Sequence, residues 1–258
     1  MAGTPLIHSV VVTGANRGIG LELVKHFLQM PNPPEAVFAT CRDSAGPGAR
    51  ELRTLASRHP NLAILQLEAT DGKSVQAAVK SAEARLAGAG LNLLINNAGV
   101  MPPCPLESAT PAGMLEVYNI NLVGPMLVTK AFLPALRTAA QASEHQGLSC
   151  RRAAIVNMST VLGSLEKTPE LYSSMPVVSY RCSKAALNML TKCQAIGYRE
   201  EGILCAAIHP GWVRTELGGE QAPLTVEESV AGIMTVLGNL SEKEHGTLLS
   251  WEGETLPW

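Results

Sequence analysis

Short runs of β-branched and apolar residues alternate along the chain with longer amphipathic stretches. The apolar runs predict strands at residues 10–12, 36–40, 63–67, 91–95, 153–157, 203–208 and 247–250. The amphipathic stretches predict helices at residues 18–28, 71–86, 115–140, 180–200 and 226–237. Gly124 and Pro125 mark an expected kink in the third helix. Alternation at this spacing predicts right-handed crossovers, and therefore an α/β fold with a doubly wound parallel sheet and helices on both faces.

No linker interrupts this alternation. The longest irregular stretches are residues 141–152 and 164–179, and the chain has neither an internal repeat nor a low-complexity tract. We therefore expect one domain over residues 1–258, large enough to bury a core without a disulfide or a metal. The second irregular stretch follows the carboxyl end of a predicted strand, where ligands bind in such sheets.

The composition narrows the class of protein. Apolar residues make up 46% of the chain and charged residues 16%, as buried parallel strands require, and the net charge of -2 does not indicate a nucleic-acid surface. The amino-terminal sequence lacks the features of a signal peptide, and no stretch reaches the roughly 20 apolar residues of a membrane span. The six cysteines form neither a C-x-x-C pair nor a metal-ligand set with histidine. We expect a cytoplasmic protein with reduced thiols, no metal, and no membrane or nucleic-acid partner.

A glycine-rich turn joins the first predicted strand to the first predicted helix. Residues 13–20 read Thr-Gly-Ala-Asn-Arg-Gly-Ile-Gly. Glycines at these positions permit a tight turn and bring the backbone close to a pyrophosphate at the helix amino terminus. We therefore expect a dinucleotide site here. Its residues in the turn are Gly14, Asn16, Arg17, Gly18, Ile19 and Gly20.

The end of the second predicted strand indicates which nicotinamide cofactor binds. An NAD enzyme has a carboxylate there, whereas this chain has Arg42, with Arg17 as a second cation in the glycine turn. Both guanidinium groups can face a 2′-phosphate, and two charge-assisted contacts of about 1.5–3 kcal/mol each would favour NADP by ~3–6 kcal/mol. Asp43 leaves an alternative open, because it can pair with Arg42.

A tyrosine and a lysine follow the fifth predicted strand. Tyr180 and Lys184 are four residues apart, so they share one face of a helix. Ketone reduction adds a hydride to carbon and a proton to oxygen. A lysine cation about 5 Å from the phenol would favour the phenolate by ~3 kcal/mol, or about two pKa units. The pair therefore predicts acid–base chemistry on a carbonyl, with Tyr180 as the general acid.

Taken together, these motifs resemble the short-chain dehydrogenase/reductase family. The resemblance covers nearly the whole chain and implies a Rossmann-type fold. Its motifs are Thr-Gly-x-x-x-Gly-x-Gly at 13–20, Asn-Asn-Ala-Gly at 96–99, Asn121, Tyr-x-x-x-Lys at 180–184 and Pro-Gly-Trp-Val-Arg-Thr at 210–215. Within the family, residues 41–42, 153–159, 209–213 and 253–258 resemble the sniffer-type carbonyl reductases, which are similar to the C-factor group.

The resemblance also implies roles for individual residues. It places Lys184 on the nicotinamide ribose, Asn121 at a water of a proton relay, and a hydroxyl after the fifth strand on the substrate oxygen. Counted back from Gly163, that hydroxyl belongs to Thr160, with Ser159 as the alternative. Asn121 can instead repair the backbone at the helix kink. Further cofactor contacts are implied for Glu68 (where the family more often has Asp), Ala69, Asn97, Ala98, Gly99, Tyr180, Lys184, Pro210, Gly211, Val213 and Thr215.

Apolar residues near these motifs predict the character of the substrate. Residues 101–103, the segment 164–179, and Trp212 with Leu217 could each form a wall of a pocket with few charges. Such a pocket suits a small apolar or aromatic carbonyl compound. The expected activity is NADPH-dependent reduction of a ketone, aldehyde or quinone. An NADP-dependent alcohol or steroid dehydrogenase and an NADP-binding scaffold or redox sensor remain alternatives, and both a homodimer and a monomer are compatible with the sequence.

Overall fold

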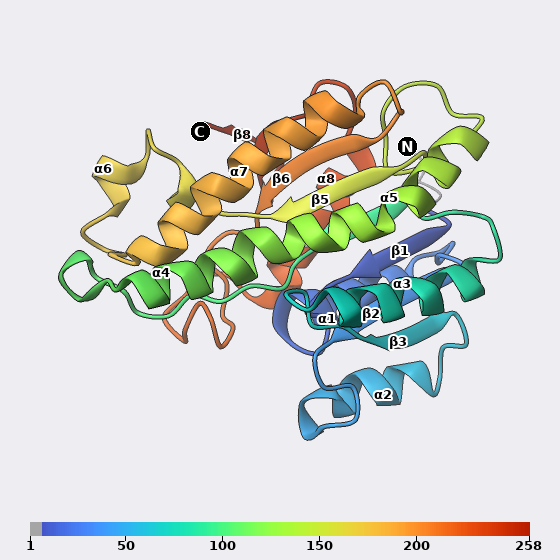
Figure 1. Cartoon of the computed structure of the whole chain (residues 1–258), viewed down its shortest axis with the longest axis horizontal. Helices are drawn as coiled ribbons and strands as arrows, with labels where there is room; N and C mark the ends of the chain where they lie inside the picture. Colours follow the sequence, from blue (N-terminus) through green and yellow to red (C-terminus); the bar gives the residue numbers. More distant parts are fainter. Residues whose placement is uncertain (1–6) are drawn as a thin grey trace.

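Eight strands form one twisted sheet in the computed structural model, which describes residues 7–258 (Figure 1). Their order across the sheet is β3-β2-β1-β4-β5-β6-β7-β8, and every neighbouring pair is parallel except the antiparallel pair of β7 and β8. The strand order reverses between β1 and β4, where a doubly wound sheet opens a ligand crevice. The strands are β1 Ser9–Val12, β2 Ala36–Cys41, β3 Leu62–Gln66, β4 Leu93–Asn96, β5 Ala154–Met158, β6 Leu204–His209, β7 Leu248–Ser250 and β8 Thr255–Leu256.

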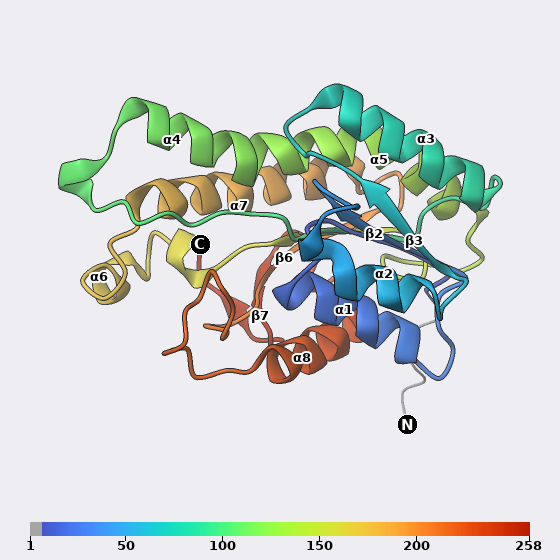
Figure 2. The ribbon, with the colours of Figure 1, turned by 90° about the horizontal axis from the view of Figure 1, so that it is seen from below.

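Helices cover both faces of the sheet. Figure 2 shows α3, α4, α5 and α7 on one side and α1, α2 and α8 on the other. The helices are α1 Gly18–Gln29, α2 Arg50–Ala56, α3 Gly72–Leu86, α4 Pro111–Tyr118, α5 Gly124–Ala142, α6 Thr168–Leu171, α7 Val178–Tyr198 and α8 Val226–Asn239. The doubly wound, Rossmann-type α/β fold that the sequence predicts is therefore confirmed, with one antiparallel strand added at the edge.

The sheet separates two apolar cores. Strand β1 shows how its residues alternate between them: Val10 and Val12 belong to the cluster that contains Phe27 of α1. Val11 belongs to the cluster that contains Phe132 of α5. All five side chains are fully buried, because both faces of a central parallel strand are covered. This burial explains why the strands read as continuous apolar runs in the sequence.

The long helix predicted at residues 115–140 is divided in two. A π-helical turn, Asn119–Val123, separates α4 from α5, so the irregularity precedes the kink expected at Gly124 and Pro125. The side chain of Asn121 bonds to the backbone of Val100 from within this turn. A helix that carries such an inserted turn aims one side chain differently from its neighbours, and π-turns often occur at functional sites.

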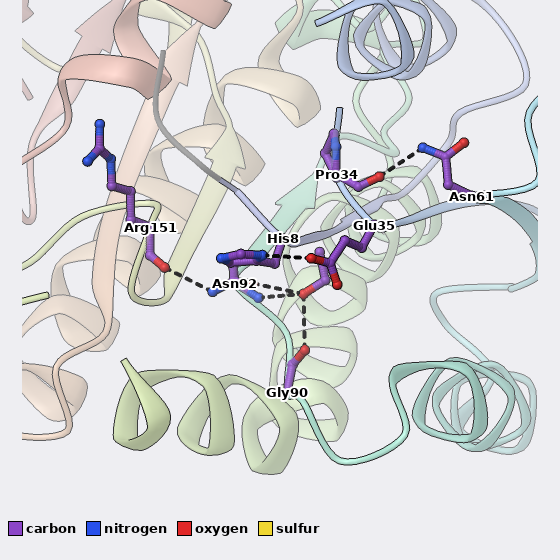
Figure 3. Close-up of polar contacts among 8 residues, drawn as sticks. His8, Pro34, Glu35, Asn61, Gly90, Asn92 and Arg151 are labelled. Carbon is purple, nitrogen blue, oxygen red and sulfur yellow. Dashed lines mark hydrogen bonds and ion pairs between the residues drawn. The ribbon is translucent and has the colours of Figure 1, made fainter. Parts of the chain in front are cut away.

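Polar contacts fasten the amino ends of the strands, at the edge opposite the carboxyl ends (Figure 3). The Ser9 hydroxyl donates to the Gly90 carbonyl at 3.0 Å and to the Asn92 side chain at 3.1 Å. The Asn92 amide in turn donates to the Arg151 carbonyl at 2.9 Å. These buried bonds hold β1, β4 and the start of β5 in register, which fixes where their carboxyl ends emerge. No helix within residues 7–258 is long and apolar enough to cross a membrane.

Candidate active site

A cavity of about 610 Å³ lies at the carboxyl ends of β1 to β6, over the point where the strand order reverses. It brings together most of the residues that the sequence predicts for a cofactor site. Those that line it are Gly14, Asn16, Arg17, Gly18, Ile19, Gly20, Arg42, Glu68, Ala69, Asn97, Ala98, Gly99, Ser159, Tyr180, Lys184, Pro210 and Thr215. The predicted residues that are not among its lining are Asn121, Thr160, Gly211 and Val213.

The glycine turn makes one wall of this cavity. Gly14 and Gly18 have φ values of +63° and +52°, which other residues adopt only with strain. A Cβ atom at Gly20 would lie 2.3 Å from the Gly14 carbonyl oxygen, so no larger residue fits there. Arg17 precedes α1 without giving it a side-chain cap, and the first N–H groups of the helix therefore remain available to an anion. This geometry fits the pyrophosphate of a dinucleotide.

Thr13 fixes the position of the turn that follows β4. Its hydroxyl accepts hydrogen bonds from the backbone N–H groups of Asn97 at 2.9 Å and Ala98 at 3.0 Å. The Asn97 side chain donates a further hydrogen bond to the Thr13 carbonyl at 2.9 Å. Thr13 was not among the predicted site residues, although it is the first residue of the glycine motif and could have been identified from it.

Both predicted cations line the cavity, and each lies beside a carboxylate. Arg17 forms an ion pair with Glu216, and the Nε atom of Arg42 lies 4.0 Å from Glu68. All these side chains are substantially exposed to solvent, and exposed ion pairs contribute at most about 1 kcal/mol. The guanidinium groups can therefore exchange these partners for a more highly charged phosphate.

Asp43 has a different role from the one left open by the sequence. Its carboxylate accepts hydrogen bonds from the backbone N–H groups of Ala45 at 3.2 Å and Gly46 at 2.7 Å. The predicted alternative, in which Asp43 pairs with Arg42, is therefore wrong in this structure. Asp43 instead stabilises the loop after β2. The carboxylate next to Arg42 is that of Glu68. The sequence predicted an adenine contact for Glu68.

Tyr180 and Lys184 lie one turn apart on α7 and are both buried. The Lys184 Nζ atom lies 5.6 Å from the centre of the Tyr180 ring and donates to the Met158 carbonyl at 2.6 Å. The contact with Met158 joins α7 to the carboxyl end of β5. The two side chains are thus held together at the floor of the cavity, as the spacing predicts.

Burial shifts the pKa values of both groups toward their neutral forms. It raises the pKa of the Tyr180 phenol above its ordinary value and lowers the pKa of Lys184 from 10.5 to about 8. For Tyr180 the direction is opposite to the one expected from the Lys184 cation alone, and its cause is burial. A phenol that keeps its proton at neutral pH is suited to donate that proton to a substrate oxygen.

Asn121 lies behind the cavity wall and close to Lys184. Its side chain accepts from the Val100 N–H at 2.9 Å and donates to the Val100 carbonyl at 2.9 Å and the Ser183 hydroxyl at 3.0 Å. A Cβ atom at Gly99 would lie 3.2 Å from the Asn121 oxygen and 3.8 Å from Lys184 Nζ. In the structure Asn121 therefore satisfies backbone groups beside the π-turn, which is one of its two predicted roles.

The two candidate hydroxyls after β5 differ in what they can donate. The Ser159 hydroxyl donates to the Asn188 side chain at 2.5 Å. The Thr160 hydroxyl instead accepts from the Leu162 N–H at 3.2 Å, at the start of the turn Val161–Gly163. Since a hydroxyl has one proton, Ser159 has already used its donor, whereas Thr160 keeps its own. Asn188 was not found from the sequence, because nothing in the motif points to it.

The expected apolar walls are only partly present. Leu217 lines the cavity, whereas Trp212 donates its indole N–H to the Gly218 carbonyl at 2.7 Å and lies outside. Residues 101–103 and 164–179 are also absent from the lining. Lining residues that were not predicted as site residues are Thr13, Cys41, Leu67, Thr70, Val100, Ile120, Met158, Arg214, Glu216 and Val226. Within residues 7–258 no group of three or more His, Cys, Asp and Glu side chains could hold a metal ion.

Comparison with known proteins adds independent observations. Residues 8–223 match the family model described as short chain dehydrogenase. The structure is similar to that of an NADPH-bound carbonyl reductase from chicken fatty liver, with a TM-score of 0.96, 53% identity and coverage of 100% of this chain and 96% of that chain. It is also similar to the carbonyl reductase Sniffer of D. melanogaster, with a TM-score of 0.93, 38% identity and coverage of 98% and 100%. The C-signal protein of Myxococcus xanthus is 36% identical over 169 residues, which cover 65% of this chain and 93% of that protein.

Proposed function

This chain belongs to the short-chain dehydrogenase family, and on that premise we propose that it reduces the carbonyl group of a ketone, aldehyde or quinone with NADPH. The family and the likeness to sniffer-type carbonyl reductases and the C-factor group, both predicted from sequence, are confirmed. Family membership makes the protein an oxidoreductase. The observation that carries the finer proposal is the burial of Tyr180 and Lys184 together at the floor of a cavity lined by the glycine turn.

The residues around the cavity fit NADPH. The glycine turn and the amino terminus of α1 would hold the pyrophosphate, and Arg17 and Arg42 would hold the 2′-phosphate. Lys184 would hold the nicotinamide ribose. A similar carbonyl reductase has NADPH bound, which supports this choice of cofactor. When bound, NADPH supplies the hydride.

The chain's own residues would orient the carbonyl and supply the proton. Thr160 follows the lining residue Ser159 and is not itself part of the cavity lining. It would reach the substrate oxygen from beside the cavity and donate a hydrogen bond, because its hydroxyl proton is not used within the turn that it caps. Tyr180 would then transfer its phenolic proton to that oxygen as hydride reaches the carbon. The Lys184 cation would stabilise the negative charge left on the Tyr180 oxygen, since the surroundings exclude most water.

Steady-state kinetics would separate this proposal from its alternatives. The purified chain would be supplied with NADPH and isatin, and separately with NADP and a secondary alcohol or a steroid alcohol. Faster turnover of isatin supports the carbonyl reductase, and faster alcohol oxidation supports a dehydrogenase. Tight NADPH binding with negligible turnover in both directions would support a scaffold or redox sensor instead. The measured oligomeric state would decide between a monomer and a homodimer.

Substitution of Thr160 tests which hydroxyl holds the substrate oxygen. Thr160→Ser should remain active, because it keeps the donor, whereas Thr160→Val should lower kcat/KM by roughly 10–10²-fold, from one hydrogen bond of about 1.5–3 kcal/mol. Ser159→Ala is the matched control and should change kcat/KM much less. If Ser159→Ala is the damaging change and Thr160→Val is tolerated, Ser159 has the role proposed for Thr160.

The pH dependence of reduction should follow Lys184. Its pKa of about 8 means that the side chain is protonated below that pH and neutral above it. The kcat/KM for isatin reduction should therefore be level near neutral pH and fall above pH 8, while Tyr180, with its raised pKa, stays protonated. Lys184→Arg keeps a cation at all these pH values and should lose the fall near pH 8, even if its activity is lower. A wild-type profile that stays level well beyond that pH would contradict the assignment.

A further inference from the structure

Arg181 is a buried arginine that the sequence motifs do not explain. It follows Tyr180 on α7 and is only 6% exposed. Its guanidinium group donates to three backbone carbonyls, those of Met175 at 2.9 Å, Leu162 at 3.2 Å and Leu171 at 2.7 Å. Among the side chains of residues 7–258, no carboxylate lies within ion-pair distance of it. Backbone carbonyl dipoles therefore take the place of a carboxylate counter-ion.

A buried charge without a counter-ion is costly unless hydrogen bonds replace its water. Arginine can make this replacement because its planar group presents five N–H donors in a fixed fork, whereas a lysine has a single compact head. The guanidinium carbon also lies 5.7 Å from the centre of the Tyr172 ring, which adds a cation–π contact. The three carbonyls thus match the donors of an arginine, and the position of the Arg181 guanidinium group depends on where these carbonyls lie.

Those carbonyls belong to two consecutive segments of the chain between β5 and α7. Leu162 lies in the turn that Thr160 caps, and Leu171 and Met175 lie in the segment 164–177, which we call the flap. The flap contains α6 and leads directly into α7. Figures 1 and 2 show α6 as a lobe at the end of the molecule toward which β5 points. Arg181 therefore joins the flap to the turn that bears the candidate substrate-binding hydroxyl.

Contacts from the rest of the chain to the ends of the flap are mainly backbone hydrogen bonds. Leu165 is 77% exposed, so apolar burial contributes little at that position. The Glu166 N–H donates to the Trp258 carbonyl at 3.2 Å, and the Val178 N–H at the flap's end donates to the Cys104 carbonyl at 2.8 Å. Segments with little apolar burial open at low free-energy cost. The bonds from Arg181 accordingly tie the flap to α7, whereas most other hydrogen bonds of the flap lie within the flap itself.

We propose that Arg181 is a positioning residue that fixes the flap against the Thr160 turn. The flap lies outside the lining of the cavity described above, so it would contact the part of a bulky aromatic carbonyl compound that extends beyond that cavity. This inference rests on the carbonyl reductase function proposed above. The flap carries Leu171, Tyr172 and Met175, all partly buried, and these are side chains of the kind that contact a flat aromatic substrate. A small dione, held by Thr160 and Tyr180 alone, would not need the flap. Arg181 acts through the flap and does not touch the reacting atoms.

Arg181→Met tests the proposal, because methionine keeps an apolar stem and removes the donors. With NADPH as reductant, the KM for isatin should rise at least ~10-fold, the equivalent of about 1.4 kcal/mol. The KM for diacetyl, the kcat values and the NADPH Kd should each stay within about 3-fold, because those contacts lie elsewhere. Arg181→Lys keeps the charge and reaches fewer carbonyls, so its KM for isatin should lie between those of wild type and Arg181→Met.

Arg152→Met is the matched control. Arg152 also binds backbone carbonyls, those of Ala140 at 3.1 Å and Gly147 at 3.4 Å, but in a loop between α5 and β5. Arg152→Met should leave the KM values for isatin and diacetyl unchanged. Hydrogen exchange of the amides in the flap should accelerate in Arg181→Met and not in Arg152→Met.

Several results would overturn the proposal. An unchanged KM for isatin would show that the flap does not shape the substrate site. An equal rise in the KM values for isatin and diacetyl, or a loss of NADPH binding, would show general damage around Tyr180. If Arg181→Met does not fold, the same comparisons apply to Arg181→Lys. If the wild type reduces neither dione, the proposed function fails, and unchanged exchange of the flap amides would then refute the positioning role separately.

Discussion

Tyr180→Phe is expected to fold and to bind NADPH while losing at least ~100-fold in the turnover of carbonyl reduction. The substitution removes a single hydroxyl and keeps the ring, which is 8% exposed and packed on α7. Burial raises the pKa of the phenol, so at neutral pH the group is present as the acid that reduction requires. Without it, water would have to supply the proton in a cavity whose floor is closed by buried side chains.

Single-turnover reduction of isatin by bound NADPH measures this loss without interference from product release. NADPH binding would be followed separately by the fluorescence of the cofactor. Tyr198→Phe is the matched control, because it makes the same change at the other end of α7 and should leave turnover unaltered. If Tyr180→Phe reduces isatin at a rate near that of the wild type, Tyr180 is not the general acid.

The parts of the fold that could be predicted are those with a strong local signal. Strand β1 and helix α1 follow directly from an apolar run, a glycine turn and an amphipathic stretch. Helix α3 follows from Asp71, whose side chain accepts from the Lys73 N–H at 2.9 Å as an N-cap should. Helices α2 and α6 and strand β8 were not predicted. They have 7, 4 and 2 residues, which is too short for a periodic pattern to form.

The π-turn was missed for a different reason. Residues 115–140 carry an amphipathic pattern that continues across the turn, so periodicity alone predicts one helix. The inserted turn depends on Asn121 reaching the backbone of Val100, in a segment that precedes the helix. Contacts of this kind belong to the tertiary structure and leave no trace in the local sequence.

The same limit applies to the candidate site. Residues within a motif, such as Gly14 and Tyr180, could be predicted because the motif carries them. Their partners could not: Arg17 and Glu216 are 199 positions apart, and nothing in the glycine turn indicates that they meet. The expected shift in the pKa of Tyr180 considered the attraction of Lys184 alone, whereas burial raises the pKa of the phenol, and burial could not be read from the spacing of the two residues.

Replacing both Arg17 and Arg42 with alanine should raise the apparent KM for NADPH by roughly 10²–10⁴-fold, from the ~3–6 kcal/mol expected for two charge-assisted contacts. NADH affinity should barely change, because NADH lacks the 2′-phosphate. Turnover at saturating NADPH should stay within a few-fold, since the lost contacts stabilise ground state and transition state alike. In the structure each arginine already has a carboxylate neighbour, Glu216 or Glu68, and a phosphate must displace it. We therefore expect the lower part of this range.

Competitive binding of NADP and NAD to the wild type and the double variant would measure the effect directly. Arg50→Ala with Arg58→Ala is the charge-matched control, because both arginines are exposed and neither lines the cavity. This control also removes two positive charges. It should reduce NADP affinity only slightly, because these charges act on the cofactor only through long-range electrostatic attraction, which salt screens. A comparable loss of NADP affinity in this control would mean that net charge, and not direct contact with the 2′-phosphate, determines the preference for NADP over NAD. Wild-type protein that binds NAD as tightly as NADP would refute the assignment of both arginines to the 2′-phosphate.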